Sequence, residues 1–301
     1  MEAVGEVVEN FFRGEGVFGK GMDASSQIPF LLEKEGYPEK LKAASPVYAG
    51  LSEFEFSDTL AILVPHEGIR FYMASMKKVM GSFNPQNENE EWKVACFFGW
   101  FKDWFCPAFE THLRHEADSL NRFLSQETPG FPDIYTSNRG ALLQYLEDIK
   151  AFEAELIAAD TPAKKGNLAH DLKVMINKLV KSTNNHLNEE EHMVPVKLKE
   201  AGTTIMHFEE DCLATMSQNV REKSRTLPLN VYVMHSWAGQ DNAEAYLDTQ
   251  VPALDRWLLV QFWMKDFRTQ SLQALKGLID GQDPTMPMKE TKSCTVDCSI
   301  M

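Results

Sequence analysis

Cysteine is sparse in this chain and follows no regular framework. Five cysteines occur in 301 residues, and none belongs to a Cys-x-x-Cys pair. An odd, scattered set in a chain of this length indicates free thiols in a reducing compartment and argues against a disulfide scaffold. The five are Cys96, Cys106, Cys212, Cys294 and Cys298.

Long apolar runs and positive charge are scarce as well. The longest uncharged apolar run near a helix, Trp257–Met264, is far too short to cross a membrane. The N-terminal stretch MEAVGEVVENFF is acidic where a secretion signal needs basic residues, so we expect a soluble, cytoplasmic protein. Lys and Arg number 30 against 44 Asp and Glu, a net charge of −14, with no basic patch. Such a surface repels phosphate backbones and disfavours nucleic acid as a partner.

Helical periodicity fills most of the chain. Apolar residues recur at alternating three- and four-residue steps, the spacing of a buried helix face. Four such segments are separated by short loops, and four long helices with short connections predict an all-α fold built on an up-down four-helix bundle. We expect them at about Ser57–Met80, Glu90–Gln126 and Ser137–Ala159, and from Thr161-Pro162, a typical helix start, to between Pro195 and Gly202.

The bundle occupies only part of the chain. We expect residues 1–55 to form an N-terminal extension, 56–202 the bundle, and 203–281 a C-terminal helical extension that includes a helix over Ala253–Ile279. Residues 282–301 contain Pro and Met among polar residues without periodicity, and this composition predicts a flexible tail.

Two His-x-x-x-Glu pairs, His112/Glu116 and His186/Glu190, continue the inward-facing stripes of their helices. Residues four apart leave the same helix face, and an unpaired imidazole or carboxylate is costly to bury. An isolated pair of this kind is more often a surface contact. Here both pairs and His66 fall on buried stripes, and this favours a metal site. Neutral imidazoles with carboxylates suit iron, manganese or zinc, and five groups exceed what one tetrahedral zinc needs.

These motifs resemble the hemerythrin-like, or HHE cation-binding, family over roughly residues 57–200. The string HEGIR at His66 looks like the first-helix signature of that family, and HLNEEEHMVP at His186 is similar to its fourth-helix signature. The resemblance implies a four-helix bundle with two iron ions, manganese or zinc being less favoured. The implied terminal ligands are His66, His112 and His186, with Glu116 and Glu190 as bridging or terminal carboxylates.

The third helix departs from the family pattern, because it contains no histidine. His170 cannot substitute, since it lies sixteen residues before His186, or about 24 Å along one helix. His66 lies fourteen residues before Met80, and the same distance back from Ala159 reaches Tyr145. We therefore consider Tyr145 as a phenolate ligand or a hydrogen-bond donor. The alternative is an open position for water, oxygen or a small anion, which favours reactivity.

Neighbouring polar residues receive plainer interpretations. His115 and His192 fall off the stripes, and we expect them to face solvent or to support a ligand. His207 and His235 lie outside the bundle and are expected to be structural. A solvated acidic face is the preferred interpretation of Glu67, Glu189 and Glu191.

The last four residues, Cys298-Ser-Ile-Met, match the C-a-a-X box with a residue that favours farnesyl. One prenyl chain anchors a protein only marginally, so a second signal is expected, and Cys294 is a candidate for palmitoylation. This pattern predicts a lipid anchor on the cytoplasmic face of a membrane in a eukaryotic protein.

Three functions follow from these patterns. The first is a di-iron protein that binds or senses oxygen, iron or a related small ligand. The second is an oxidase, or an enzyme that handles peroxide or nitric oxide at the same centre. The third is a membrane-tethered helical interaction protein whose metal site is degenerate.

Overall fold

The structure, a computed structural model, describes residues 53–127, 134–201, 219–238, 243, 247 and 251–284. Within these residues the regular elements are all helical and there is no strand, so the all-α prediction is confirmed. Residues 1–52 of the predicted extension, the tail from 285 on, His207, Cys212, Cys294 and Cys298 lie outside the described residues, while residues 53–55 already belong to the first helix. Cys96 and Cys106 are free thiols.

The predicted helices are present close to their expected bounds. The first is α4 (Glu53–Ser82), and the 3-10 turn η3 (Glu88–Glu90) follows it. The second is one continuous helix, divided by two π-helical turns into α5 (Trp92–Trp100), η4 (Phe101–Phe105), α6 (Cys106–His115), η5 (Glu116–Leu120) and α7 (Asn121–Glu127). The third and fourth are α8 (Ile134–Ala158) and α9 (Pro162–Ala201).

Further helices follow the predicted bundle. They are α12 (Val220–Ala238) and a continuous helix made of α14 (Ala253–Leu258), η7 (Leu259–Trp263), α15 (Met264–Asp266), η8 (Phe267–Leu272) and α16 (Gln273–Asp280). None of the helices in the described ranges is long and apolar enough to span a membrane.

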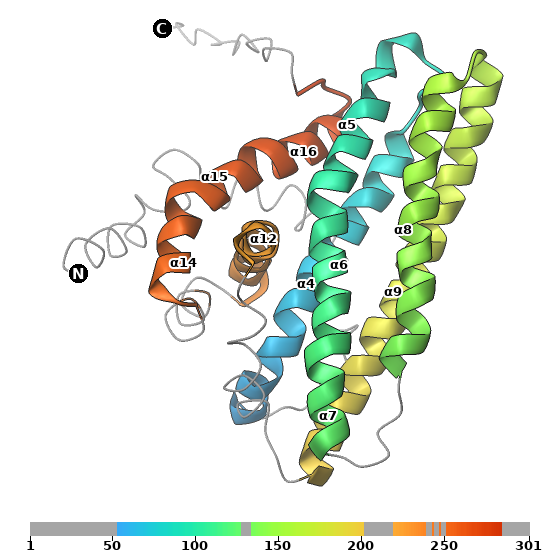
Figure 1. Ribbon diagram of the computed structural model, residues 1–301. Coiled ribbons are helices and arrows are strands. Elements are labelled where there is room, and N and C mark those ends of the chain that lie inside the picture. Colours follow the sequence, from blue (N-terminus) through green and yellow to red (C-terminus); the bar gives the residue numbers. More distant parts are fainter. Residues whose placement is uncertain are drawn as a thin grey trace, which may run out of the picture.

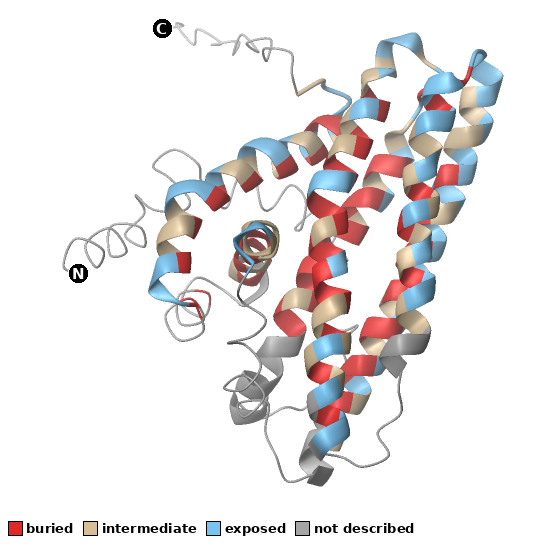
Figure 2. Cartoon of the chain, viewed as in Figure 1, coloured by how far each residue is buried: buried red, intermediate tan, exposed pale blue. Residues whose placement is uncertain are grey.

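The long helices lie side by side (Figure 1). Helix α9 packs against α8 and α4, and α8 also packs against α5 and α6. On the other side, α12 packs against α4 and α6, and α16 packs against α4 and α5. Helix α4 therefore has neighbours on opposite faces, and most of its residues from Leu63 to Met80 are buried (Figure 2). A helix apolar on nearly all sides is expected at such a central position.

Aromatic contacts join the C-terminal helices to the rest of the molecule. The ring centroids of Phe71 on α4 and Tyr232 on α12 are 5.6 Å apart, and those of Trp104 and Phe267 are 5.8 Å apart. Ser271 lies between two more rings: its Oγ is 3.1 Å from the Tyr72 hydroxyl and accepts a hydrogen bond from Trp100 Nε1 at 3.0 Å. The buried apolar residues thus form one core that includes α12 and α14–α16.

Pro107 lies next to the first π-helical turn. Because proline has no N–H and its ring clashes with the carbonyl four residues earlier, it removes one hydrogen bond of a regular helix at this point. The Cys106 N–H instead bonds the Phe101 carbonyl, five residues back, which forms η4. The carbonyl of Asp103, four residues before Pro107, accepts a hydrogen bond from Arg225 Nε of α12 at 2.9 Å. The proline therefore creates an attachment point for α12.

Candidate metal centre

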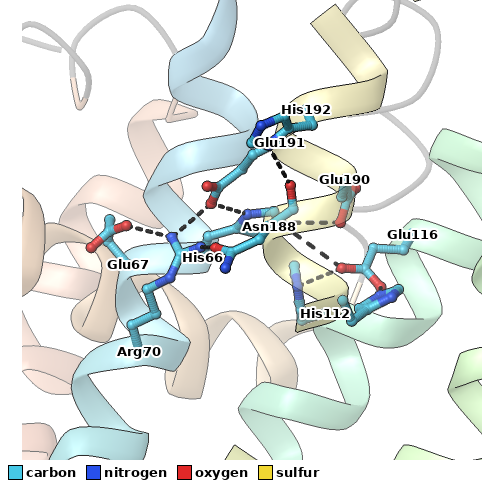
Figure 3. Close-up of polar contacts among 10 residues, drawn as sticks. His66, Glu67, Arg70, His112, Glu116, Asn188, Glu190, Glu191 and His192 are labelled. Atoms are coloured by element: carbon cyan, nitrogen blue, oxygen red, sulfur yellow. Dashed lines mark hydrogen bonds and ion pairs between the residues drawn. The ribbon is translucent and has the colours of Figure 1, made fainter. Parts of the chain in front are cut away.

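Four buried side chains bring their ligand atoms within 4.8 Å of one another, and such a group could hold a metal ion. His66 comes from α4, His112 from α6, Glu116 from the first residue of η5, and Glu190 from α9. Three separate long helices thus converge on one point (Figure 3). The sequence predicted all four residues as ligands.

The separations between these atoms lie close to those of donors around one ion, with one inside the expected range, one above it and one below it. Two donors that each lie about 2.0–2.2 Å from one ion are roughly 3–3.5 Å apart across a tetrahedral angle. His66 Nε2 is 3.2 Å from Glu190 Oε2 and 4.0 Å from Glu116 Oε1, while His112 Nε2 is 2.6 Å from Glu116 Oε1. The set of two imidazoles and two carboxylates is therefore compact enough for a metal.

The contact between His112 and Glu116 is close without being a hydrogen bond. Their atoms Nε2 and Oε1 are 2.6 Å apart, yet neither has a hydrogen-bond partner within the part of the chain that the structure describes. Buried polar atoms almost always have a partner, and an exception needs an explanation such as a missing water or ion. A cation coordinated by both atoms would supply that explanation.

His186 lies on the outer side of this cluster. Its Nε2 donates a hydrogen bond to Glu116 Oε2 at 2.9 Å, whereas Glu116 Oε1 faces His112. Glu116 therefore turns its two oxygens in two directions. The predicted ligand His186 is joined to the site, but it is not one of the four residues whose ligand atoms lie mutually within 4.8 Å.

A second layer of polar contacts fixes the orientation of His66. Its Nδ1 donates to Glu191 Oε1 at 2.7 Å, which leaves Nε2 directed at the cluster. Arg70 Nη1 donates to the same Glu191 oxygen and to Glu67 Oε1, both at 2.6 Å, and Arg70 Nη2 donates to Asn188 Oδ1 at 3.0 Å. A carboxylate that holds the other nitrogen of a ligating histidine is typical of metal sites in proteins.

Four buried carboxylates lie in or beside the cluster. Glu67, Glu116, Glu190 and Glu191 are all buried, and Arg70 is the guanidinium that contacts two of them. Buried charge of one sign is costly unless it is paired, protonated or bound to a metal. The cluster therefore favours cations.

The pKa values reflect the buried carboxylates. Burial lowers the pKa of His66, but the carboxylates of Glu190 and Glu191 more than offset this and raise it to about 10. Burial and the nearby charge of Glu116 raise the pKa of Glu190 to about 7. The two carboxylates beside His66 thus favour a positive charge at this position.

The pKa values of Glu116 and His112 are lowered. Burial would raise the pKa of Glu116, yet contacts with His112 and His186 hold it well below its usual value. Burial lowers the pKa of His112 despite the neighbouring Glu116. A deprotonated carboxylate beside a neutral imidazole is the form in which both bind metals.

The prediction that Glu67, Glu189 and Glu191 form a solvated acidic face is wrong for two of the three residues. Glu67 and Glu191 are buried beneath Arg70, because the guanidinium and His66 provide the partners that make their burial tolerable. Glu189 is exposed as expected. His192 is exposed, and half-buried His115 has its pKa lowered to about 4 by burial and by Arg114.

Tyr145 is half-buried on α8 and packs against the hydrophobic core. Two ion pairs join α8 to the second helix: Arg139–Asp118 before Tyr145 and Glu153–Lys102 after it. Tyr145 on α8 and His112 on the second helix both lie between these two ion pairs. Its hydroxyl makes no hydrogen bond with the cluster among the described residues. The buried face of α8 consists instead of Leu142, Leu146, Ile149 and Leu156.

Periodicity missed several residues of the site. Along α9 the buried stripe is Ile176, Leu179, Thr183, His186, Glu190 and Val194. Met175, Ser182 and Met193 fit three- and four-residue steps with His186 and Glu190 equally well, yet they are half-buried. Periodicity alone does not decide between the two series. Arg70 within HEGIR was the signal for the supporting carboxylates, since a buried arginine needs acidic partners.

No family model matches this chain, and neither does a curated protein or a solved structure.

Proposed function

We propose that this protein is a non-haem metal protein of hemerythrin-like type, whose metal ion binds a small ligand such as dioxygen. One observation carries the proposal: a buried cluster of two imidazoles and two carboxylates whose ligand atoms lie within 4.8 Å of one another. His66, His112, Glu116 and Glu190 would hold the ion. The side-by-side packing of α4, α5–α7, α8 and α9 supports an up-down four-helix bundle as the framework.

The donor set favours iron, with manganese and zinc as alternatives. Mixed imidazole and carboxylate donors suit all three ions, while the absence of a cysteine from the cluster disfavours soft ions. Bound iron would supply a redox-active centre with affinity for small ligands. The protein's own residues orient the ligands: Glu191 fixes the ring of His66, and His112 and His186 keep Glu116 deprotonated.

We further propose that the site can hold a second metal ion. Glu116 Oε2 and His186 Nε2 lie 2.9 Å apart on the outer side of the cluster. That separation suits two ligands of one ion at an angle of about 90°, provided that the His186 proton is displaced. Glu116 would then bridge two ions. Metal content per chain distinguishes one ion from two.

The test is metal content measured on purified protein reconstituted with Fe²⁺, Mn²⁺ or Zn²⁺. We expect one or two ions per chain in the unaltered protein and loss of most of the metal in His112→Ala. His170→Ala is the matched control, because His170 is an exposed histidine on α9. It should bind metal normally.

Thermal unfolding gives an independent measurement. A ligand that binds only the folded state stabilises it, by about 2.7 kcal/mol at a hundred times its dissociation constant. For a domain of this size that corresponds to a rise of roughly 5–10 °C in Tm. Unaltered protein that binds no metal and melts at the same temperature with each ion would contradict the proposal.

A further inference from the structure

Thr183 is a buried polar residue that the protein itself leaves unsatisfied. Its side chain is 0 % exposed, and its Oγ1 has no hydrogen-bond partner among the residues that the structure describes. A helical threonine normally bonds a carbonyl in the preceding turn, as Thr226 does with the carbonyl of Glu222 at 3.1 Å. An orphaned buried hydroxyl costs about 1–3 kcal/mol, so its retention needs an explanation.

The position of Thr183 places it beside the metal cluster. It lies three residues before His186 and seven before Glu190, and residues at these spacings share one face of a helix. Helical side chains lean toward the N-terminus, so the His186 imidazole covers the turn that carries Thr183. The hydroxyl therefore lies on the His186 side of the cluster.

The described apolar residues near that hydroxyl offer it no hydrogen-bond partner. On α9 the adjacent buried residues are Leu179, Val180 and Leu187, and α8, which packs against α9, buries Leu142 and Leu146. The four clustered ligand residues come from α4, the second helix and α9, so the described part of α8 contributes none of them. The side of the cluster that faces α8 is therefore the side with room for a further ligand of the ion.

We propose that the Thr183 hydroxyl donates a hydrogen bond to a small ligand that binds the metal on the side facing α8. The ligand class is a small anion or diatomic molecule with an acceptor atom. Thr183 would thus be a binding residue for the ligand and not for the metal. The inference rests on the proposed function, because it needs an ion in the cluster.

The experiment compares Thr183→Val, which removes the hydroxyl and keeps the shape, with Thr183→Ser, which keeps the hydroxyl. Each full-length protein is loaded with Co²⁺, whose visible absorption reports changes in its ligands, and is titrated with azide as the probe. We expect equal metal content in all proteins. Azide binding should be roughly fivefold to tenfold weaker in Thr183→Val, the loss of about one hydrogen bond, and near normal in Thr183→Ser.

The metal-free proteins provide a second readout. Replacing an unsatisfied hydroxyl by a methyl group of the same shape is neutral or stabilising. Thr183→Val should therefore melt at or above the temperature of the unaltered protein. The control Thr226→Val loses a satisfied hydrogen bond, so it should melt slightly lower and bind azide normally.

Different outcomes separate the two proposals. Absence of metal from the unaltered protein would refute the metal site itself. Normal metal content with unchanged azide affinity in Thr183→Val would overturn the inference alone. Loss of metal in Thr183→Val, or a metal-free variant that melts several degrees lower, would also overturn it, because the hydroxyl would then serve the metal or the fold.

Discussion

At the scale of single residues, the site depends on the layer of contacts behind its ligands. Glu191 is the clearest case, because it binds no cluster atom except the far nitrogen of His66. Its carboxylate fixes which imidazole nitrogen carries the proton and so directs the other nitrogen at the ion. Arg70 holds Glu191 in turn at 2.6 Å.

Glu191→Gln should weaken metal binding by about 10- to 100-fold while the protein stays folded, since removal of such a supporting carboxylate has that effect in other metal sites. Glu189→Gln is the matched control, because Glu189 is the exposed glutamate two residues earlier. Competition with a chelator measures the affinities, and circular dichroism checks the fold. Equal affinities in the two variants would show that His66 needs no such support.

His112, Glu116 and Glu190 were predictable because two independent patterns coincide at them, whereas His66 was indicated by its buried stripe and by the string HEGIR. The spacing His-x-x-x-Glu puts two donors on one face, and the three- and four-residue steps put that face inside. Glu191 has neither signal, since it lies beside the stripe and its burial depends on Arg70 from another helix. Thr183 was missed because Ser182 lies next to it and both fit a helical period.

At the scale of helices, the bounds of the four predicted helices could be read from periodicity, loops and caps in the sequence. The π-helical turns were not predicted from these features. A signal for η5 is nevertheless present in the sequence. The buried residues His112, Glu116, Leu120 and Leu124 follow one another at steps of four, and each such step drifts about 40° around a regular α-helix. A wider turn that begins at Glu116 keeps them on one side.

Contact between α4 and α12 gives a prediction at this scale. A Cβ added to Gly68 would lie 2.9 Å from Asn230 Oδ1 and 3.1 Å from Leu229 Cγ, whereas one added to Gly99 meets nothing within 4 Å. Gly99→Ala should stabilise the protein by roughly 0.5–1 kcal/mol through helix propensity. Gly68→Ala should destabilise it by about 1 kcal/mol, because overpacking exceeds that gain.

Urea unfolding measures both free energies of unfolding. Equal stabilisation by the two alanines would mean that α4 and α12 do not pack as closely as the structure has them. Metal content should stay normal in Gly99→Ala.

At the scale of the whole molecule, a boundary near residue 202 does not separate two cores. Phe71, Tyr72 and Trp104, which precede that boundary, pack against Tyr232, Ser271 and Phe267, which follow it. Helical periodicity identifies that a residue is buried but not which helix covers it. The sequence therefore located α4, the second helix, α8, α9 and the helix from Ala253, but it gave no bounds for α12 and did not indicate that α12 and α16 would cover α4.

A chain ending at residue 201 retains the four cluster residues. If the motifs alone determined metal binding, this shortened chain should still bind the metal. We expect it to fold poorly, because it would expose the aromatic face of α4 and leave the Trp100 N–H without its Ser271 partner. Binding of a hydrophobic dye and loss of a cooperative thermal transition would report this. Phe267→Ala is a milder version and should cost about 3–5 kcal/mol. A stable, metal-binding fragment would show that the bundle is independent.

The π-helical turn at Glu116 has a consequence for insertions and deletions. Removing one residue from 117–120 would let the chain form an unbroken α-helix, with every backbone hydrogen bond intact. The wider turn holds about one residue more than a regular turn, so the residues of α7 would keep nearly the same direction around the helix. Leu124, now fully buried, would still face the core, because it would follow His112 by eleven residues, or about three regular turns. In this helix the segment after Glu116 should therefore tolerate the loss of one residue, whereas the loss of a second would rotate Leu124 by about 100°.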